Sequence, residues 1–310
     1  MRPFLFCSVL AGLAIGLGCQ REGGIGVSVD SVFRPLIPPD VKALVSIHLD
    51  KLLQAPLYIR HQKDVDFAQL DSASERFGLN PRRDLSDLLV VWNGKTAVLM
   101  AKGSFDQRQL EQKLGTLGAR TQTYSDDTIL ESGNEALAFI KRGVAIAGPL
   151  SSVHAALDSK DKGSGGIPEL FKQSLQGVPA DDQIWIVSRG GLPFADVPMN
   201  SDWESALSNI VDYVTATTAS IGVDTGMRFR ADIACVSNQG AQRVHDALRA
   251  AVGFGRLSTK DNELELLKLY DSIQVTQEQR FVHVRADLKA DLADKLIAQL
   301  SALQSTSRLR

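Results

Sequence analysis

The sequence predicts an α+β fold of two similar halves, each an antiparallel sheet of hairpins with helices packed on one face. Short turn signals, such as Asn93-Gly94 and Asp224-Thr225-Gly226, join neighbouring apolar runs, which is the pattern of β-hairpins. Parallel strands need a crossover helix after each strand, and these runs lack one. Matched elements also recur in the same order roughly 134 to 139 residues apart, which indicates an internal repeat.

The first half begins with a partly alternating apolar run that predicts a strand. Helical spacing of Phe67, Leu70, Ala73 and Phe77 predicts a helix that ends before Asn80-Pro81. Ser104 with Gln107 three places on resembles a capping box at a helix start. The expected elements are a strand at 43–49, a helix at 67–77, a hairpin of 88–92 with 96–100, a helix at 104–117, a hairpin of 137–140 with 144–147, and a helix at 151–157.

The second half repeats this order, with one exception. Leu264, Leu267 and Tyr270 predict a helix at 256–271, where the matching stretch 119–132 looks extended. Gly253-Phe254-Gly255 is expected to end the helix before it, since glycine is a common helix stop. The other expected elements are a strand at 183–187, a helix at 203–214, a hairpin of 219–223 with 227–236, a helix at 241–252, a hairpin of 273–275 with 281–284, and a helix at 290–303.

Composition along the chain suggests where the halves meet. Gly23-Gly24-Ile25-Gly26 and Pro38-Pro39 are typical of a flexible or extended tether. Lys160–Gly166 is rich in glycine and charge and predicts a linker. The predicted organisation is a signal peptide at 1–18, a flexible tether at 19–39, a first α+β repeat at 40–160, a linker at 161–181, a second α+β repeat at 182–303 and a tail at 304–310.

The first residues have the three parts of a secretory signal peptide. Arg2 supplies a positive start, Phe4–Gly18 is an uncharged and mostly apolar run, and small residues mark the cleavage site. The run is about 15 residues long, whereas a membrane-spanning helix needs about 20. The chain is therefore expected to be exported.

The end of this segment, Gly16-Leu17-Gly18-Cys19, resembles the lipobox of bacterial lipoproteins, although the usual leucine position holds Gly16. The resemblance implies that Cys19 is lipidated, becomes the mature N-terminus and anchors the protein to a membrane of the cell envelope. Gln20 is not the aspartate that retains enteric lipoproteins in the inner membrane, so the resemblance implies the outer membrane, facing the periplasm. The alternatives are an ordinary signal peptide, with Cys19 incidental, and an uncleaved N-terminal anchor.

Charge and cysteine content exclude several classes. Lys and Arg number 34 and Asp and Glu 36, which gives a net charge of −2 and no basic footprint for nucleic acid. Charged residues make up 23% and apolar residues 44%, the composition of a globular protein. Apart from Cys7 and Cys19, only Cys235 is present, so a lipidated mature chain forms no internal disulfide.

No motif in the sequence indicates a reaction, a metal or a cofactor. No histidine stands three or four residues from another or near a cysteine, as zinc ligands usually do. The glycine clusters do not lie between a strand and a helix, where phosphate loops occur. The acidic pairs Asp126-Asp127 and Asp181-Asp182 are typical of turns. The histidines are His48, His61, His154, His245 and His283.

These observations favour a lipid-anchored, non-catalytic envelope protein that binds a protein partner or helps an assembly. One alternative is a periplasmic carrier of an apolar ligand, with a pocket lined by residues such as Val90, Val98 and Ile233. Another is an enzyme whose site is assembled from distant loops. Residues 20–310 have only a general likeness to bacterial envelope proteins.

The lipid at Cys19 is testable by mass. We expect the purified mature chain to start at Cys19, with a blocked N-terminus and acyl mass on that residue. Cys19→Ala should release the protein from membranes or leave the precursor uncleaved, since stable attachment depends on the acyl chains. An intact mass without acyl groups on Cys19 would end the idea.

Overall fold

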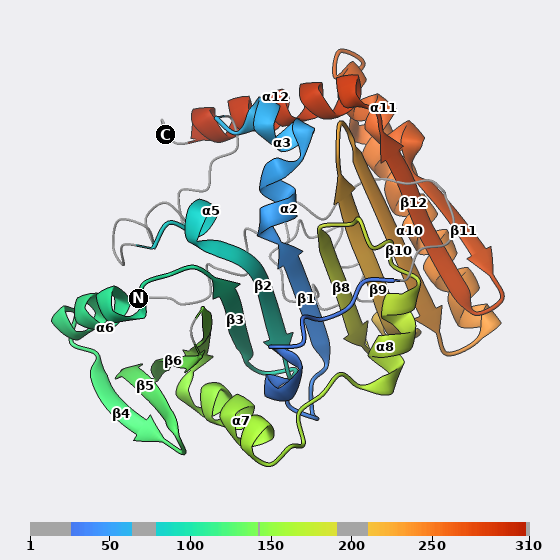
Figure 1. Cartoon of the computed structure of the whole chain (residues 1–310). Helices are drawn as coiled ribbons and strands as arrows, with labels where there is room; N and C mark the ends of the chain where they lie inside the picture. Colours follow the sequence, from blue (N-terminus) through green and yellow to red (C-terminus); the bar gives the residue numbers. More distant parts are fainter. Residues whose placement is uncertain (1–25, 64–78, 142, 191–209, 308–310) are drawn as a thin grey trace. The chain divides into compact units, whose positions relative to one another are not determined.

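The structure, a computed structural model, describes residues 26–63, 79–141, 143–190 and 210–307 (Figure 1). They belong to two compact units. The N-terminal unit comprises Gly26–Leu53 and Phe67–Gly177, and the C-terminal unit comprises Gln54–Asp66 and Val178–Arg310. The predicted signal peptide, Cys19, the predicted helix at 67–77 and most of the predicted helix at 203–214 lie outside the described residues.

The N-terminal unit contains an antiparallel sheet with the strand order β1-β2-β3-β7-β6-β5-β4. Its strands are β1 (Ala43–His48), β2 (Leu85–Trp92), β3 (Ala97–Gly103), β4 (Arg120–Tyr124), β5 (Asp127–Ser132), β6 (Glu135–Lys141) and β7 (Val144–Pro149). Its helices are η1 (Arg34–Leu36), α2 (Leu49–Gln54), which ends at the unit boundary, α5 (Pro81–Asp84), α6 (Gln107–Thr116), α7 (Leu150–Asp161) and α8 (Glu169–Gln176).

The C-terminal unit contains an antiparallel sheet with the strand order β8-β9-β10-β12-β11. Its strands are β8 (Ile184–Arg189), β9 (Val214–Val223), β10 (Met227–Cys235), β11 (Gln274–Glu278) and β12 (Phe281–Leu288). Its helices are α3 (Pro56–His61), α10 (Asn238–Ser258), α11 (Leu264–Ser272) and α12 (Ala290–Ser307). None of the helices in the described part of the chain combines the length and the apolar content that a membrane crossing requires.

The predicted α+β class with antiparallel sheets of hairpins is confirmed. The order β1-β2-β3-β7-β6 in one unit has the same pattern as β8-β9-β10-β12-β11 in the other. The stretch 119–132, predicted to be extended, holds the added strands β4 and β5, and the C-terminal unit has α11 at that point. Similarity of the two halves in three dimensions stays a prediction.

Local chemistry explains the β2–β3 hairpin. Gly94 has a φ of +99°, a conformation that side chains rarely adopt. The Asn93 side-chain oxygen accepts hydrogen bonds from the backbone N–H groups of Lys95 and Thr96, each at 3.0 Å. This turn returns the chain so that Val91 lies opposite Val98.

Helices of the N-terminal unit lie on both faces of its sheet, which corrects the prediction of packing on one face. Leu110 of α6 packs with Leu130, Phe139 and Ala145. Lys160 of α7 instead pairs with Asp127, three residues before Leu130 and thus on the opposite face of β5. Because β5 and β6 are apolar on both faces, with Ile129 also fully buried, each face needs a cover.

The start of α6 also differs from the prediction. The helix begins at Gln107, and the side chain of Asp106 caps it by accepting a hydrogen bond from the Gln109 N–H at 3.1 Å. Ser104 therefore does not form the predicted capping box. Its backbone N–H donates to the carbonyl of Asp84 at 2.7 Å instead.

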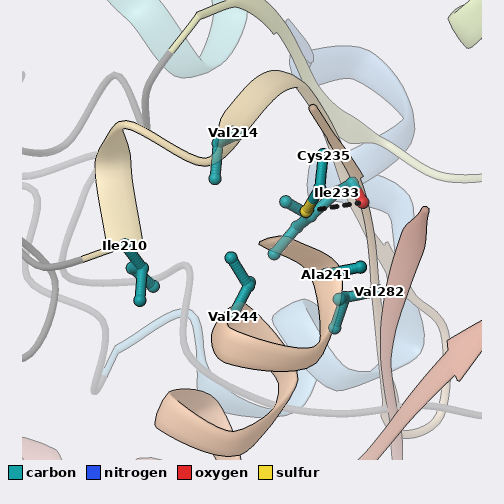
Figure 2. Packing of buried hydrophobic residues seen from close by; sticks show 7 residues of the cluster. All are labelled: Ile210, Val214, Ile233, Cys235, Ala241, Val244 and Val282. Atoms are coloured by element: carbon teal, nitrogen blue, oxygen red, sulfur yellow. Dashed lines mark hydrogen bonds between the residues drawn. The ribbon is translucent and has the colours of Figure 1, made fainter. Parts of the chain in front are cut away.

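The core of the C-terminal unit forms between α10 and one face of its sheet (Figure 2). Val244 of α10 packs with Ile233 of β10 and Val282 of β12, which lie opposite one another in the ladder. Cys235 belongs to the same cluster and is 1% exposed, in agreement with its prediction as a small buried residue. Burial raises the pKa of its thiol.

The tether prediction is wrong for residues 26–39. Val29, Phe33 and Leu36 are almost fully buried, and the N–H of Gly166 donates to the carbonyl of Ile37 at 3.0 Å. A Cβ on Gly165 would stand 1.7 Å from the carbonyl oxygen of Pro35, so glycine permits this close approach. Apolar side chains among the glycines and prolines make this segment part of the core.

The predicted domain boundaries need correction as well. Helix α8 lies inside the predicted linker 161–181 and buries Phe171 and Leu175 completely or nearly so. Helix α12 continues to Ser307, into the predicted tail 304–310. The predicted first repeat 40–160 is interrupted, because α3 belongs to the C-terminal unit.

Contacts of α3 within the C-terminal unit explain that interruption. The Leu57 N–H donates to the carbonyl of Asp224 at 2.8 Å, and the Leu57 side chain is 1% exposed. Arg60 Nη2 and His61 Nε2 contact the same carboxyl oxygen of Asp294, at 2.9 and 2.7 Å. These contacts join residues 54–63 to α12.

The core role of the N-terminal segment can be tested with Leu36→Ala. Leu36 is fully buried, so its truncation should lower the free energy of unfolding by about 2–5 kcal/mol in denaturant titrations. Leu117→Ala is the control, because Leu117 is 50% exposed and should cost about 0.5 kcal/mol or less. If Leu36→Ala and Leu117→Ala lowered the free energy of unfolding equally, residues 26–39 would again be interpreted as a flexible tether.

Candidate functional site

The histidines lie apart and have local partners. His48 contacts Asp87 at 2.7 Å, and His283 contacts Asp232 at 2.6 Å. His61 contacts Asp294 and His245 contacts Asp246, while the ring of His154 stacks on Tyr124 with centroids 3.8 Å apart. Within the described ranges, no His, Cys, Asp and Glu side chains gather in a group that could hold a metal ion.

A charged cluster lies at one end of β1, β2 and β3. Asp87 accepts hydrogen bonds from His48 and from the hydroxyl of Ser86 at 2.8 Å, while Lys102 pairs with Asp30 at 2.5 Å. The bond from His48 holds the pKa of Asp87 below its ordinary value, against the effect of burial. Ser86 donates to the carboxylate and not to the imidazole, so the arrangement lacks the hydrogen bond by which a base activates a serine.

The acidic pair Asp181-Asp182 has a structural role. Asp182 is fully buried and accepts a hydrogen bond from the hydroxyl of Ser220 at 2.6 Å, and burial raises its pKa. Arg228 contacts Asp181 at 2.5 Å and Asp182 at 3.4 Å. A Cβ on Gly222 would stand 2.3 Å from the Asp182 carboxyl oxygen, so glycine makes room for the acid.

The other acidic pair is divided. Asp126 lies in the two-residue turn between β4 and β5, in agreement with its prediction as a turn residue. Asp127 begins β5 and pairs with Lys160 of α7. Asp126 and Asp127 therefore do not act as a pair, whereas the carboxylates of Asp181 and Asp182 converge on Arg228.

The structure shows a small polar cavity in the N-terminal unit. Its volume is about 130 Å³, whereas pockets for drug-sized ligands occupy roughly 300–1,000 Å³. Val98 and Ile233, named above as pocket residues for a carrier, are 3% and 4% exposed and lie within cores. The cavity is lined by Leu79, Arg83, Asp84, Ser104, Phe105, Asp106, Gln109 and Leu110.

An exposed apolar surface lies at the junction of α10 and α11. Phe254 and Leu257 of α10 are 58% and 83% exposed, and Leu264 of α11 is 55% exposed. Phe254 and Leu257 are three residues apart and so share one side of the helix. We call these three side chains the apolar surface. Contiguous exposed apolar patches larger than roughly a few hundred Å² mark interaction sites.

Contacts between the last turns of α10 and helix α11 hold this surface in place. Gly255 allows close packing of the two helices, since a Cβ there would lie 2.5 Å from the ring of Tyr270. Arg256 pairs with Asp271, and the Thr259 hydroxyl donates to the carbonyl of Gly255 at 2.8 Å. The apolar side chains therefore belong to two helices, α10 and α11, that are held together by these contacts.

Helix α11 is itself incompletely covered. None of its residues is fully buried, although it carries several large apolar side chains. A helix with this much apolar content normally buries one face in the core. The half-buried members of this set are Leu266, Leu267, Leu269 and Tyr270.

This surface does not follow from the sequence prediction that Gly253-Phe254-Gly255 ends the helix. The helix instead continues to Ser258, and it presents Phe254 and Leu257 on its last turns. The helical spacing of Phe254 and Leu257 relative to Val244 and Leu248 is a signal in the sequence, because it places both residues off the side of the helix that Val244 buries. The expected site residue, Cys19, lies outside the described residues.

Comparisons with known proteins bear on the fold. No family model and no curated protein matches the chain. Solved structures of TP0453 do: crystal form III has a TM-score of 0.50 at 10% identity and covers 89% of this chain and 99% of that one. Crystal form I (TM-score 0.48, 11% identity, 89% and 98% covered) and crystal form IV (0.49, 10%, 88% and 97%) also match. The chain is thus an α+β protein, and its fold is similar to that of TP0453 in crystal form III.

The charged cluster makes a pH-dependent prediction. Because the pKa of Asp87 is lowered by folding, the unfolded state binds more protons near pH 4. The stability that Asp87 contributes is therefore complete above about pH 4 and is lost as the pH falls through the folded pKa. Asp87→Asn should lower the free energy of unfolding by about 1.5–3 kcal/mol at pH 6, and by clearly less at pH 3. Equal deficits at both pH values in urea titrations would contradict this account.

Proposed function

We propose that the chain is a lipid-anchored, non-catalytic envelope protein that binds a protein partner through the apolar surface. The observation that carries the proposal is the exposure of Leu257, at 83%, between Phe254 and Leu264. Leaving these side chains in water forgoes about 1.5–3 kcal/mol for each large apolar group that a partner would bury. A bound partner is a physical reason for such an arrangement.

The composition of the surface favours a protein as the occupant. Aromatic side chains are enriched at the centre of protein interfaces, and Phe254 supplies one beside two leucines. The pair Arg256–Asp271 borders these residues and provides hydrogen-bonding groups of both signs, as the polar rim of an interface does. The lipid at Cys19 and the location in the outer membrane, facing the periplasm, belong to the same proposal and rest on the signal-peptide resemblance.

The proposal can be tested with a photoreactive phenylalanine analogue in place of Leu257 in the full chain. Illumination of intact cells should give a discrete cross-linked protein band. Phe254→Ser in the same chain should reduce the yield about tenfold, because truncation of a central interface side chain typically costs 1–2 kcal/mol or more. Circular dichroism should show no change in Tm, because Phe254 is exposed.

The matched control places the same analogue at Leu117, an exposed leucine on the other unit that should give no discrete band. Bands of equal yield from positions 117 and 257 would contradict the proposal. Cross-links to lipid alone would show that the surface binds a membrane and would overturn the assignment of a protein partner.

A further inference from the structure

The strand β4 lies at one end of the sheet of the N-terminal unit (Figure 1). Its side chains from Arg120 to Thr123 are exposed, and Tyr124 is half-buried. The Tyr124 ring stacks on His154 of α7, and its hydroxyl donates to Asp158 at 2.9 Å. The edge strand is therefore exposed along its length but held firmly at one end.

The register of β4 shows which of its backbone groups face outward. The loop between β4 and β5 contains two residues, and Ser125 has a φ of +52°. In such a turn the N–H of Asp127 bonds to the carbonyl of Tyr124, so these residues form a hydrogen-bonded pair. Hydrogen-bonded pairs alternate with others along the ladder, so Gln122 also bonds to β5. The backbone groups of Thr121 and Thr123 then point away from the sheet.

The central residues of β4, 121–123, lack the usual side-chain protections of an edge strand. Natural edges are blocked by lysine, by proline or by a bulge. The sequence Arg-Thr-Gln-Thr-Tyr has neither lysine nor proline, and the β4–β5 register has no shift. The edge strand of the C-terminal unit, β11, packs against α10, and the Gln277 side chain donates to the carbonyl of Asn238 at 3.0 Å.

We propose that β4 pairs with β4 of a second copy of this chain, antiparallel and centred on Gln122. In that register Thr121 lies opposite the partner's Thr123, and the two exchange both of their backbone hydrogen bonds. The two-fold axis repeats the pair, with Thr123 opposite the partner's Thr121. All outward groups of these two residues are then satisfied.

The side chains fit the same register. Arg120 lies opposite the partner's Tyr124, a cation beside an aromatic ring. Threonine lies opposite threonine, a favourable pair on a sheet, and no like charges face one another. The strand is therefore complementary to itself, which is why a second copy is the occupant and not an unrelated strand. A symmetric pair of edges also closes the assembly at two chains.

The pairing does not require the lipid anchor, although anchoring two copies to one membrane would raise their effective concentration. The experiment is disulfide trapping in the full chain, in intact cells, with Gln122→Cys. Gln122 lies opposite the partner's Gln122 in a non-hydrogen-bonded pair, where Cα atoms are about 4.5 Å apart and a disulfide can form. The wild-type chain sets the background from Cys19 and Cys235.

Thr123→Cys is the matched control, because two copies of residue 123 are offset by about 7 Å along the strands and cannot be bridged without movement. We expect Gln122→Cys to form the disulfide-linked dimer at least ten times faster than Thr123→Cys. Equal rates at the two positions, or no dimer from Gln122→Cys, would overturn the proposal.

A charge test in the Gln122→Cys chain separates specific pairing from collision. Thr121→Lys with Thr123→Lys places like charges opposite one another and should reduce trapping about tenfold. Thr121→Lys with Thr123→Glu places opposite charges face to face at the same exposed positions and should retain it. Similar trapping by both double variants, with unchanged circular dichroism, would show that β4 does not pair in this register.

Discussion

Antiparallel hydrogen bonding is the constraint on which both units depend. Successive side chains of a strand point to opposite faces of the sheet. Each face of every strand must therefore either pack against another element or be exposed to solvent. In β5 this places Asp127 and Ile129 on the side of α7 and Leu130 on the side of α6. The same constraint leaves the edge strands β4 and β11 with a strand partner on one side only, and the exposure of their outer backbone groups decides whether another strand can pair there.

Several carboxylates among the described residues join elements that are distant in sequence. Asp87 connects β2 to β1 through His48, Asp294 connects α12 to α3, and Asp127 connects β5 to α7. Removing one partner of a buried or half-buried pair costs more than the pair contributes, because the remaining charge stays desolvated. These acids are thus better understood as cross-links of the fold than as reactive groups.

The hairpins were predictable because their turns carry local chemistry, as Asn93-Gly94 does. The burial of Phe33 and Leu36 was not, because glycine and proline composition says nothing of what the apolar residues between them touch. The end of α10 was misplaced because Gly255 serves close packing against Tyr270 and not helix termination. Helical spacing places Leu257 away from the buried side of Val244, but the absence of a covering element over Leu257 is a tertiary feature that spacing does not show.

The incorporation of residues 26–37 into the core has a consequence for geometry at a membrane. With the lipid proposed at Cys19, seven residue steps lead to Gly26, and they span at most about 25 Å when fully extended. A small folded unit is itself wider than that. The folded part of the chain would therefore stay close to the bilayer surface, and it would meet other molecules only in a thin layer next to the lipid headgroups.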